Sequence, residues 1–335
     1  MYCKYLDKTK YEVHYVGFHK GLPDRTLDDV VVHHIQMSNN RWNRYFLYIK
    51  QINKIIRKEK FDLLFLVDCK GSLFIRLFNM HIPSVMDVRT GDIHLGKKWI
   101  SVLNLRILFS TLFFQHITVL SENLRKLLHL PGRKCTVIPL GADILNRSDK
   151  KFDNLFLFYV GGLQERNITQ TIEGLSLFAE RNPEISFEYN IVAYGNDESV
   201  KALLKVIEKT ELTGKVRYHG RKNHDEIAEI FNKSNIGVVY VPITRGYTCQ
   251  PTTKLYEYVL SGMSVIATKT KENEKDVLPL AGVLVEDNPE AFSRGLEEIC
   301  KIKHLYSSDQ IRQQYMHFQW EEIVGKNLEP LLDKL

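Results

Sequence analysis

The sequence predicts an α/β protein made of two successive doubly wound domains, each with a parallel sheet covered by helices on both faces. Three observations lead to this prediction. Strand patterns alternate with helix patterns along most of the chain, and the series starts again after the polar stretch 141–151, which suits a linker. The length of 335 residues corresponds to roughly two domains of about 150 residues each.

The first half contains short apolar runs separated by longer segments with helical spacing. The run 61–67 (FDLLFLV) is nearly continuous in apolar residues, as a parallel strand buried on both faces should be. The expected strands are 11–17, 30–35, 61–67, 83–88, 116–120 and 136–139, and the expected helices are 44–60 and 99–114.

The opening of this half departs from the usual pattern. Residues 1–10 (MYCKYLDKTK) are typical of the end of a helix. A doubly wound domain begins with a strand and a glycine-rich turn before that helix. The first domain is therefore expected to lack its first strand. Three explanations stay open: a truncated chain, a mis-assigned start or a degenerate protein.

The second half repeats the alternation with a clear order. Because ligands of doubly wound sheets bind at the carboxyl ends of strands, the turns after these strands are where chemistry is expected. The expected strands are 155–160, 187–193, 216–219, 236–240, 264–268 and 283–285, and the expected helices are 169–181, 198–210, 225–233, 252–260 and 289–302.

Composition excludes several classes of protein. Hydrophobic residues make up 44% and charged residues 26%, which is ordinary for a globular core and excludes disorder, collagen and coiled coil. No apolar run approaches the length of about 18 residues that spans a bilayer, and the amino terminus has no apolar signal core. The five cysteines are scattered, which indicates a reducing compartment and no metal knuckle.

Charge is divided unevenly between the halves. Residues 1–150 contain 24 Lys and Arg against 13 Asp and Glu, whereas residues 151–335 contain 22 against 27. A basic half can meet anionic lipid, an acidic substrate or nucleic acid, or it can be a solvated surface. Nucleic acid is the weakest of these, because no recognition motif accompanies the basic residues.

The segment 161–167 (GGLQERN) follows a buried strand and precedes a helix. Gly161 and Gly162 would let the phosphates of a ligand approach the backbone, and Arg166 could offer them a bidentate charge-assisted bond. An ordinary strand-to-helix turn is the alternative.

The segment 250–258 (QPTTKLYEY) is a stronger signal. Thr252 and Thr253 suit a helix start, where free N–H groups favour a diphosphate, and Lys254 adds a positive charge. Glu257 lies one turn further, where its carboxylate could accept both hydroxyls of a ribose. The alternative is a surface helix with both charges solvated.

Between these two segments lies 216–221 (VRYHGR), a strand end followed by a turn. Backbone groups of such a turn can contact the edge of a nucleobase, with Arg217, His219 and Arg221 beside them. A packed histidine is an equally good interpretation of His219.

The three segments, in this order, resemble the carboxy-terminal domain of the GT-B glycosyltransferases, in particular the large retaining family "glycosyl transferases group 1" (family four). The pattern strand–Gly–x–Leu…Arg, then V-x-Y-x-G, then P-x-x-K-L-x-E-Y-x-x-x-G-x-x-V-I-A-T is specific in combination and covers about 155–289. The first half is similar more loosely, through HITVLSENLRKLL and TVIPLGAD among others.

The resemblance implies a fold and a domain division. It implies two Rossmann-like domains: an acceptor-side domain at 1–145, to which 317–335 crosses back, and a nucleotide-sugar domain at 146–316. It also implies a retaining transfer of a sugar from a nucleotide-diphosphate donor, without a metal or a further cofactor.

The same resemblance assigns roles to residues. Arg166 and Lys254 meet the charge of the leaving diphosphate, and Glu257 matches the second acid of the E-x7-E motif. The first acid falls on Cys249, and the basic residue usual after the strand is replaced by Gly162. Asp87, Arg89 and His94 are candidates on the acceptor side, with Arg89 counted among the catalytic residues.

We therefore expect a hexosyltransferase-type enzyme at the cytoplasmic face of a membrane, acting on a polysaccharide or lipid-linked acceptor. The basic first half and the apolar helix 99–114 suit an interfacial location, and core packing is the alternative for that helix. A nucleotide-sugar 2-epimerase lacks a carboxylate-rich acid–base set. A catalytically impaired nucleotide-sugar-binding subunit or pseudoenzyme remains as the second hypothesis, favoured by Cys249 and the missing strand.

Overall fold

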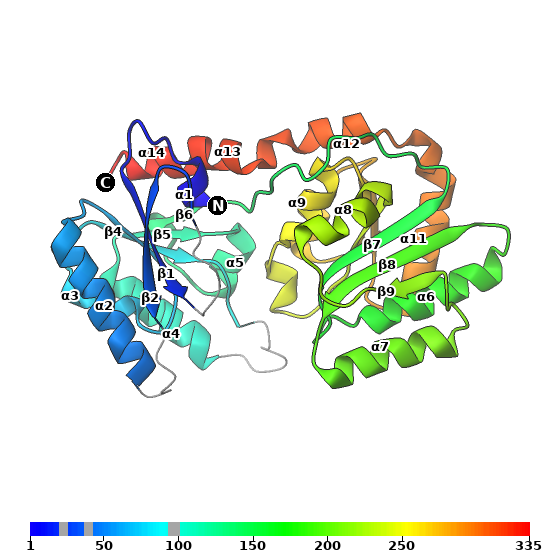
Figure 1. Ribbon diagram of the computed structural model, residues 1–335, viewed down its shortest axis with the longest axis horizontal. Helices are drawn as coiled ribbons and strands as arrows, with labels where there is room; N and C mark the ends of the chain where they lie inside the picture. Colours follow the sequence, from blue (N-terminus) through cyan, green and yellow to red (C-terminus); the bar gives the residue numbers. More distant parts are fainter. Residues whose placement is uncertain (20–25, 37–42, 93–100) are drawn as a thin grey trace. The chain divides into compact units, whose positions relative to one another are not determined.

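The structure is a computed structural model that describes residues 1–19, 26–36, 43–92 and 101–335 (Figure 1). It divides into two compact units. The first consists of Met1–Pro139 together with Trp320–Leu335, and the second of Leu140–Gln319. The amino-terminal and carboxy-terminal ends of the chain therefore belong to the same unit.

The described residues of the first unit form six parallel strands in two separate sheets. One sheet pairs β1 with β2, and the other has the order β3-β4-β5-β6. These strands are β1 (Val13–His19), β2 (Val30–Gln36), β3 (Leu64–Val67), β4 (Ser84–Val88), β5 (His116–Val119) and β6 (Cys135–Val137).

The strand order can be compared with the expectation that the first unit lacks its first strand. In a doubly wound sheet the first strand lies innermost, between the second strand and the fourth. Here β1 and β2 take the places of the second and third strands, and β3 takes that of the fourth. In the described residues no ladder joins β1 to β3, so the sheet is interrupted at the position of the expected first strand.

Helices of the first unit complete its core. Residues of β2, α2, β3 and α3 form a buried apolar cluster that holds both sheets against the same helices. The helices are α1 (Tyr2–Tyr5), α2 (Asn43–Glu59), α3 (Ser72–Phe78), α4 (Val102–Ser110), α5 (Glu122–Leu127), α13 (Trp320–Ile323) and α14 (Glu329–Leu332). The expectation that 1–10 contains the end of a helix is confirmed by α1.

The returning carboxy-terminal helices pack on α1. The Tyr2 ring makes edge contacts with Trp320 of α13 and Phe65 of β3. The Asp7 backbone N–H donates to Glu329, 2.8 Å away, and Lys10 pairs with Asp333. These contacts join the two ends of the chain into one unit.

The second unit has a single six-stranded parallel sheet in the order β12-β11-β10-β7-β8-β9. Its strands are β7 (Leu155–Gly162), β8 (Phe187–Tyr194), β9 (Val216–Tyr218), β10 (Ile236–Val239), β11 (Ser264–Thr268) and β12 (Gly282–Val285). The chain runs outward from β7 through β8 to β9 and then returns to β10 on the other side of β7. The crevice between β7 and β10 is therefore the topological switch point, where doubly wound sheets bind ligands.

Helices flank this sheet as expected, with additional short ones. They are α6 (Ile168–Arg181), α7 (Asp197–Lys209), α8 (His224–Lys233), α9 (Thr253–Leu260), α10 (Lys271–Asp276), α11 (Pro289–Ile302) and α12 (Ser308–Tyr315). Helices α3, α5 and α10 were not predicted, because a segment of six or seven residues is too short to show a helical period. The expected helix 99–114 ends earlier, as α4 followed by a 3-10 turn, Thr111–Phe113, and its first two residues lie outside the described part of the chain.

Close packing fixes the position of α9 at the switch point. Gly237 of β10 lies so near the Tyr258 ring that a Cβ at this glycine would be 2.1 Å from the ring. The Tyr258 hydroxyl accepts a hydrogen bond from the Val160 backbone N–H of β7, 3.1 Å away. Tyr258 is fully buried. Helix α9 is therefore held beside the carboxyl end of β7.

Candidate active site

The end of β7 forms the base of the site. The Tyr159 hydroxyl donates a hydrogen bond to the Gly162 carbonyl, 2.6 Å away, at the end of the strand. Gly161 has φ of +150°, and a Cβ there would lie 3.2 Å from the Lys254 ammonium nitrogen. The backbone conformation favours a glycine at this position, and a Cβ would have to displace the Lys254 amine or the Tyr159 hydroxyl slightly.

Lys254 is the central cation of the site. Its ammonium nitrogen lies 4.1 Å from the centroid of the Tyr159 ring. Burial of the amine and the nearby charge of Arg166 lower its pKa, Glu257 acts in the opposite direction, and the net result is a pKa of about 7. The ammonium form of Lys254 is therefore destabilised in the free protein, and an anion bound beside it would stabilise it.

Arg166 is held in place by an aromatic ring. Its guanidinium carbon lies 4.6 Å from the centroid of the Tyr247 ring, and Tyr247 is buried in the 3-10 turn Tyr247–Cys249. A stacked guanidinium keeps its N–H donors at the edge free to point elsewhere. Arg166 and Lys254 are close enough to repel one another, so a polyanion between them would relieve that repulsion.

The start of α9 adds donors to these charges. Thr252 is the N-cap, but its side chain makes no capping bond, and its buried hydroxyl has no partner in the described part of the chain. Thr253, the first residue of the helix, is exposed. The first N–H groups of a helix carry partial positive charge and bind phosphate readily. Glu257 follows one turn later, half-buried, on the same helix.

A second group of side chains lies at the ends of β8 and β9. A Cβ at Gly162 would be 3.8 Å from the Tyr194 ring, and the Arg221 guanidinium carbon lies 6.0 Å from the centroid of that ring. Tyr194 is 60% exposed. This exposed ring therefore lies between the glycine turn and the turn that follows β9.

His219 is fixed by hydrogen bonds. Its Nε2 lies 2.7 Å from the amide oxygen of Asn190, which requires the proton on Nε2, and its backbone N–H donates to Ile191. Burial lowers the pKa of its imidazole, and the charges of Lys222 and Arg217 add to the effect. The His219 side chain is therefore packed, as one of the two interpretations expected. The backbone of the turn that follows it lies at the end of β9.

Arg217 is directed elsewhere. Its guanidinium pairs with Glu188 at 3.2 Å, and Glu188 also receives Lys233 at 3.1 Å. The structure therefore gives Arg217 a surface ion pair along β8 and does not place it with Arg166 and Lys254.

Cys249 occupies the position at which the resemblance expected an acid. It is 5% exposed, and burial raises the pKa of its thiol. A neutral thiol cannot serve as a carboxylate, so Glu257 is the only member of that acid pair in this sequence.

The candidates of the first unit form a separate network. The buried Asp87 carboxylate of β4 accepts from Arg89 and from the Thr118 hydroxyl, each at 2.7 Å. The Arg89 guanidinium carbon lies 4.5 Å from the centroid of the Tyr2 ring. Arg89 is therefore engaged with α1 and β4. His94 lies outside the described residues.

Sequence reasoning missed the aromatic side chains that hold the cations. Tyr159 and Tyr247 were not singled out, because a tyrosine in a strand or loop is usually core. The signal was weak but present: Tyr159 sits two residues before Gly161, on the strand that ends at the glycine turn. Among the described residues, no group of three His, Cys, Asp or Glu side chains is placed to hold a metal ion.

The chain matches two family models. Residues 1–144 match the family described as Glycosyltransferase Family 4, and residues 143–314 match Glycosyl transferases group 1. No curated protein matches the chain.

Several solved structures share the fold at low identity. Sucrose-phosphate synthase from Thermosynechococcus elongatus has a TM-score of 0.77 at 15% identity, over 99% of this chain and 91% of that one. HepE of Anabaena, solved with UDP, has a TM-score of 0.66 at 15% identity, over 92% and 87%. The lipopolysaccharide outer core galactosyltransferase WaaB has a TM-score of 0.66 at 11% identity, over 92% and 85%.

The two matched families together span nearly all of the doubly wound architecture described above, and the second contains every residue of the Arg166–Lys254 group. The chain belongs to the Glycosyl transferases group 1 family and is a glycosyltransferase with the two-domain GT-B fold.

Proposed function

We propose that this glycosyltransferase moves a sugar, with retention of anomeric configuration and without a metal ion, from a nucleoside-diphosphate donor to a polysaccharide or lipid-linked acceptor. The observation that carries the proposal is the convergence of Arg166, Lys254 and the start of α9 around Gly161. Three sources of positive potential meet where the backbone has no side chain to exclude a ligand.

The chemistry requires such a convergence. When the bond from the sugar to the diphosphate breaks, negative charge develops on the leaving phosphate. Preorganised cations and N–H donors stabilise this charge in the way that a metal ion otherwise would. Lys254 is poised for the task, because its pKa of about 7 rises when an anion binds beside it.

The nucleoside is assigned to neighbouring groups. Glu257 would accept the ribose hydroxyls, and the turn 219–221, with Tyr194 and Arg221, would lie along the base. The UDP held by HepE, a protein of similar fold, is in keeping with a nucleoside-diphosphate donor.

The acceptor and its location follow from different features. All five cysteines are free, as is usual in a reducing cytoplasm. In the described residues no helix is long and apolar enough to cross a membrane. A basic first half suits an acceptor carried on an anionic membrane surface. Arg89 and Asp87 are the groups of the first unit proposed for the acceptor side.

The test combines binding with turnover. The protein is titrated with UDP, GDP and ADP by calorimetry, and the sugar donor of the best-bound nucleotide is then incubated with the protein. Release of sugar or transfer to a lipid extract, followed by proton NMR of the anomeric signal, reports both activity and retention. Inversion of the anomeric signal would overturn the retaining assignment.

A second function is favoured by one observation. The buried thiol of Cys249 replaces an acid expected from the resemblance. A nucleotide-sugar-binding subunit without catalysis would keep the Arg166–Lys254 group and lose turnover. Tight nucleotide binding without donor hydrolysis, even with acceptor present, would favour this alternative.

A further inference from the structure

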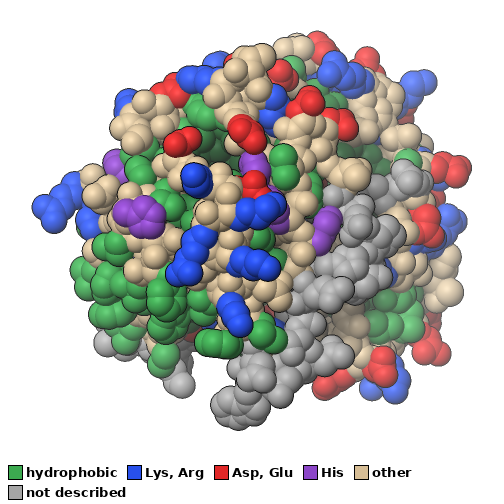
Figure 2. All heavy atoms as spheres, turned by 60° about the vertical axis from the view of Figure 1, so that its left-hand side comes forward, with side chains coloured by type: hydrophobic (Ala, Val, Ile, Leu, Met, Phe, Trp, Pro, Cys, Tyr) green, Lys and Arg blue, Asp and Glu red, His purple; other side chains and the backbone are tan. Residues whose placement is uncertain are grey.

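Two neighbouring helices of the first unit expose apolar stripes. On α3, Phe74, Leu77 and Phe78 are 54%, 41% and 62% exposed, at the spacing of one helical face. Most of the large hydrophobic side chains exposed in the described part of the chain belong to this unit. Figure 2, which brings the side of this unit forward, shows hydrophobic side chains gathered at the lower left of the face with Lys and Arg beside them.

The stripe on α4 is longer and continues into the 3-10 turn behind it. Val102, Leu105, Phe109 and Leu112 are 86%, 51%, 54% and 68% exposed. Their spacing of three, four and three residues places them on one face. Solvent-facing apolar stripes of this size mark a surface that another phase or molecule covers.

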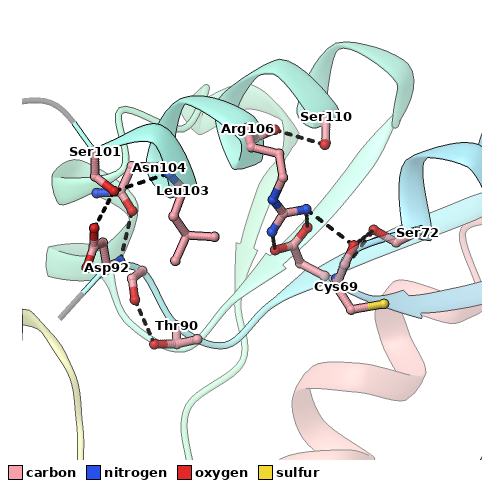
Figure 3. A network of polar contacts seen from close by, with 11 residues as sticks. Cys69, Ser72, Thr90, Asp92, Ser101, Leu103, Asn104, Arg106 and Ser110 are labelled. Atoms are coloured by element: carbon pink, nitrogen blue, oxygen red, sulfur yellow. Dashed lines mark hydrogen bonds and ion pairs between the residues drawn. The ribbon is translucent and has the colours of Figure 1, made fainter. Parts of the chain in front are cut away.

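These helices are firmly attached to the sheet by their opposite faces. The buried Arg76 guanidinium of α3 donates to the Phe113 carbonyl at 3.0 Å and to the Ile82 carbonyl at 2.7 Å. Arg106 of α4 points inward to Asp68 and to the Cys69 carbonyl at the start of α3, as Figure 3 shows. Ser101 caps α4 by accepting from the Leu103 N–H. The outward apolar side chains are therefore presented by an ordered support.

The charged residues of these helices are mostly positive. The sequences of α2, α3 and α4 contain a single acidic residue, Glu59, which is bonded to its neighbour Lys58. Helix α2 packs against α3 and exposes Lys50, Lys54 and Arg57 along one face, which begins with the 67% exposed Phe46. Apolar stripes beside a predominantly basic helix are the composition of an interfacial membrane surface.

We propose that the surface formed by the exposed residues of α2, α3 and α4 with its 3-10 turn, here called the α2–α4 face, docks on an anionic lipid bilayer. The proposal deepens the proposed function by naming the part of the chain that meets the membrane. The apolar stripes enter the boundary between headgroups and acyl chains, and the α2 cations lie over anionic headgroups. A predominantly basic face argues against a protein partner of ordinary mixed charge.

The experiment is co-flotation of the full chain with two kinds of vesicle, one of phosphatidylcholine alone and one that also contains about 30% phosphatidylglycerol. Each is tested at low and at high salt. We expect binding to the anionic vesicles that weakens with salt. The combined variant Leu105→Gln, Phe109→Gln, Leu112→Gln should lower the bound fraction about tenfold on these vesicles. The variant Lys50→Gln, Lys54→Gln should lower it severalfold and flatten its salt dependence.

Helix α7 of the second unit offers matched controls. It exposes Leu204 between the exposed Lys201 and Lys205. The variants Leu204→Gln and Lys201→Gln, Lys205→Gln should bind vesicles like the unaltered protein. Retained nucleoside-diphosphate affinity, which reports on the second unit, and an unchanged circular dichroism spectrum show that the α4 variant still folds.

Three results would overturn the docking proposal. The first is no flotation of the unaltered protein with anionic vesicles, and the second is equal flotation of the α4 variant. The third is a concentration-dependent dimer that the same α4 variant dissociates, which would assign the face to a second copy of the chain. Each of these leaves sugar transfer to a soluble acceptor untouched, so the proposed function is judged separately.

Discussion

The ammonium nitrogen of Lys254 lies 4.1 Å from the centroid of the Tyr159 ring and directly beside Gly161. An aromatic face attracts a cation, but burial and the neighbouring Arg166 oppose the charge, and the net effect is a pKa of about 7. A lysine in this state gains most from an incoming anion. The relationship links the glycine turn of β7 with the start of α9 and leads to the first two predictions.

Replacing either cation should weaken nucleotide binding. Arg166→Ala and Lys254→Ala should each cost about 1.5–3 kcal/mol in the free energy of binding a nucleoside diphosphate, the worth of a charge-assisted hydrogen bond. Calorimetry measures the change. Arg217→Ala is the matched control, because its guanidinium pairs with Glu188, and it should leave the affinity unchanged. Equal losses in all three variants would contradict the placement of the diphosphate.

Binding should be accompanied by proton uptake above neutral pH. At pH 8 Lys254 is mostly neutral in the free protein, and a bound diphosphate raises the pKa of its amine, so up to one proton is taken up. At pH 6 the amine is already charged and uptake from it vanishes. Calorimetry in buffers of different ionisation enthalpy counts the protons. In Lys254→Met the uptake at pH 8 should disappear, and its persistence there would assign the proton to another group.

Gly161→Ala should damage binding more than stability. The new methyl group would lie 3.2 Å from the Lys254 nitrogen, and the φ of +150° is strained for alanine. We expect at least a tenfold loss of nucleotide affinity and a loss of about 1–2 kcal/mol in the free energy of unfolding. Gly214→Ala is the control, because that glycine has φ of +92° and open space around it. It should lose comparable stability and keep full affinity.

Glu257 should discriminate the sugar of the nucleotide. An ionised carboxylate can accept both hydroxyls of a ribose, and an unpaired partner costs about 1–3 kcal/mol. Glu257→Gln should therefore weaken the binding of a ribonucleoside diphosphate more than that of its deoxyribose counterpart. Equal affinities of the unaltered protein for the two ligands would reject the ribose assignment, whatever the variant did.

Catalysis should proceed without a divalent cation. The Arg166–Lys254 group and the α9 N-terminus meet the leaving-group charge in its place. Titration with a chelator should leave the transfer rate within about twofold of its starting value. Complete loss of transfer that added Mg²⁺ or Mn²⁺ restores would reject this prediction.

Much of the fold could be predicted, because its signals are local. A parallel strand buried on both faces is a continuous apolar run, and β7 was recognised in this way. The helix beginning at Thr253 was recognised from its cap residues and its spacing. Short helices such as α10 escaped, because their stability comes from the Thr270 cap and from packing rather than from a long pattern.

The sequence by itself determined the longer strands and helices, the parallel, doubly wound arrangement of the second unit, and the set of residues from which a phosphate site could be drawn. Only the tertiary structure decided which of these meet. Arg166 stacks on Tyr247 and Lys254 lies over Tyr159, which places the two cations near one another. Arg217 pairs with Glu188, and no ladder joins β1 to β3 in the described residues. The physical reason is that strand and helix periods are set by neighbours in the chain, whereas the pKa of an amine and the partner of a guanidinium depend on residues that packing brings from far away.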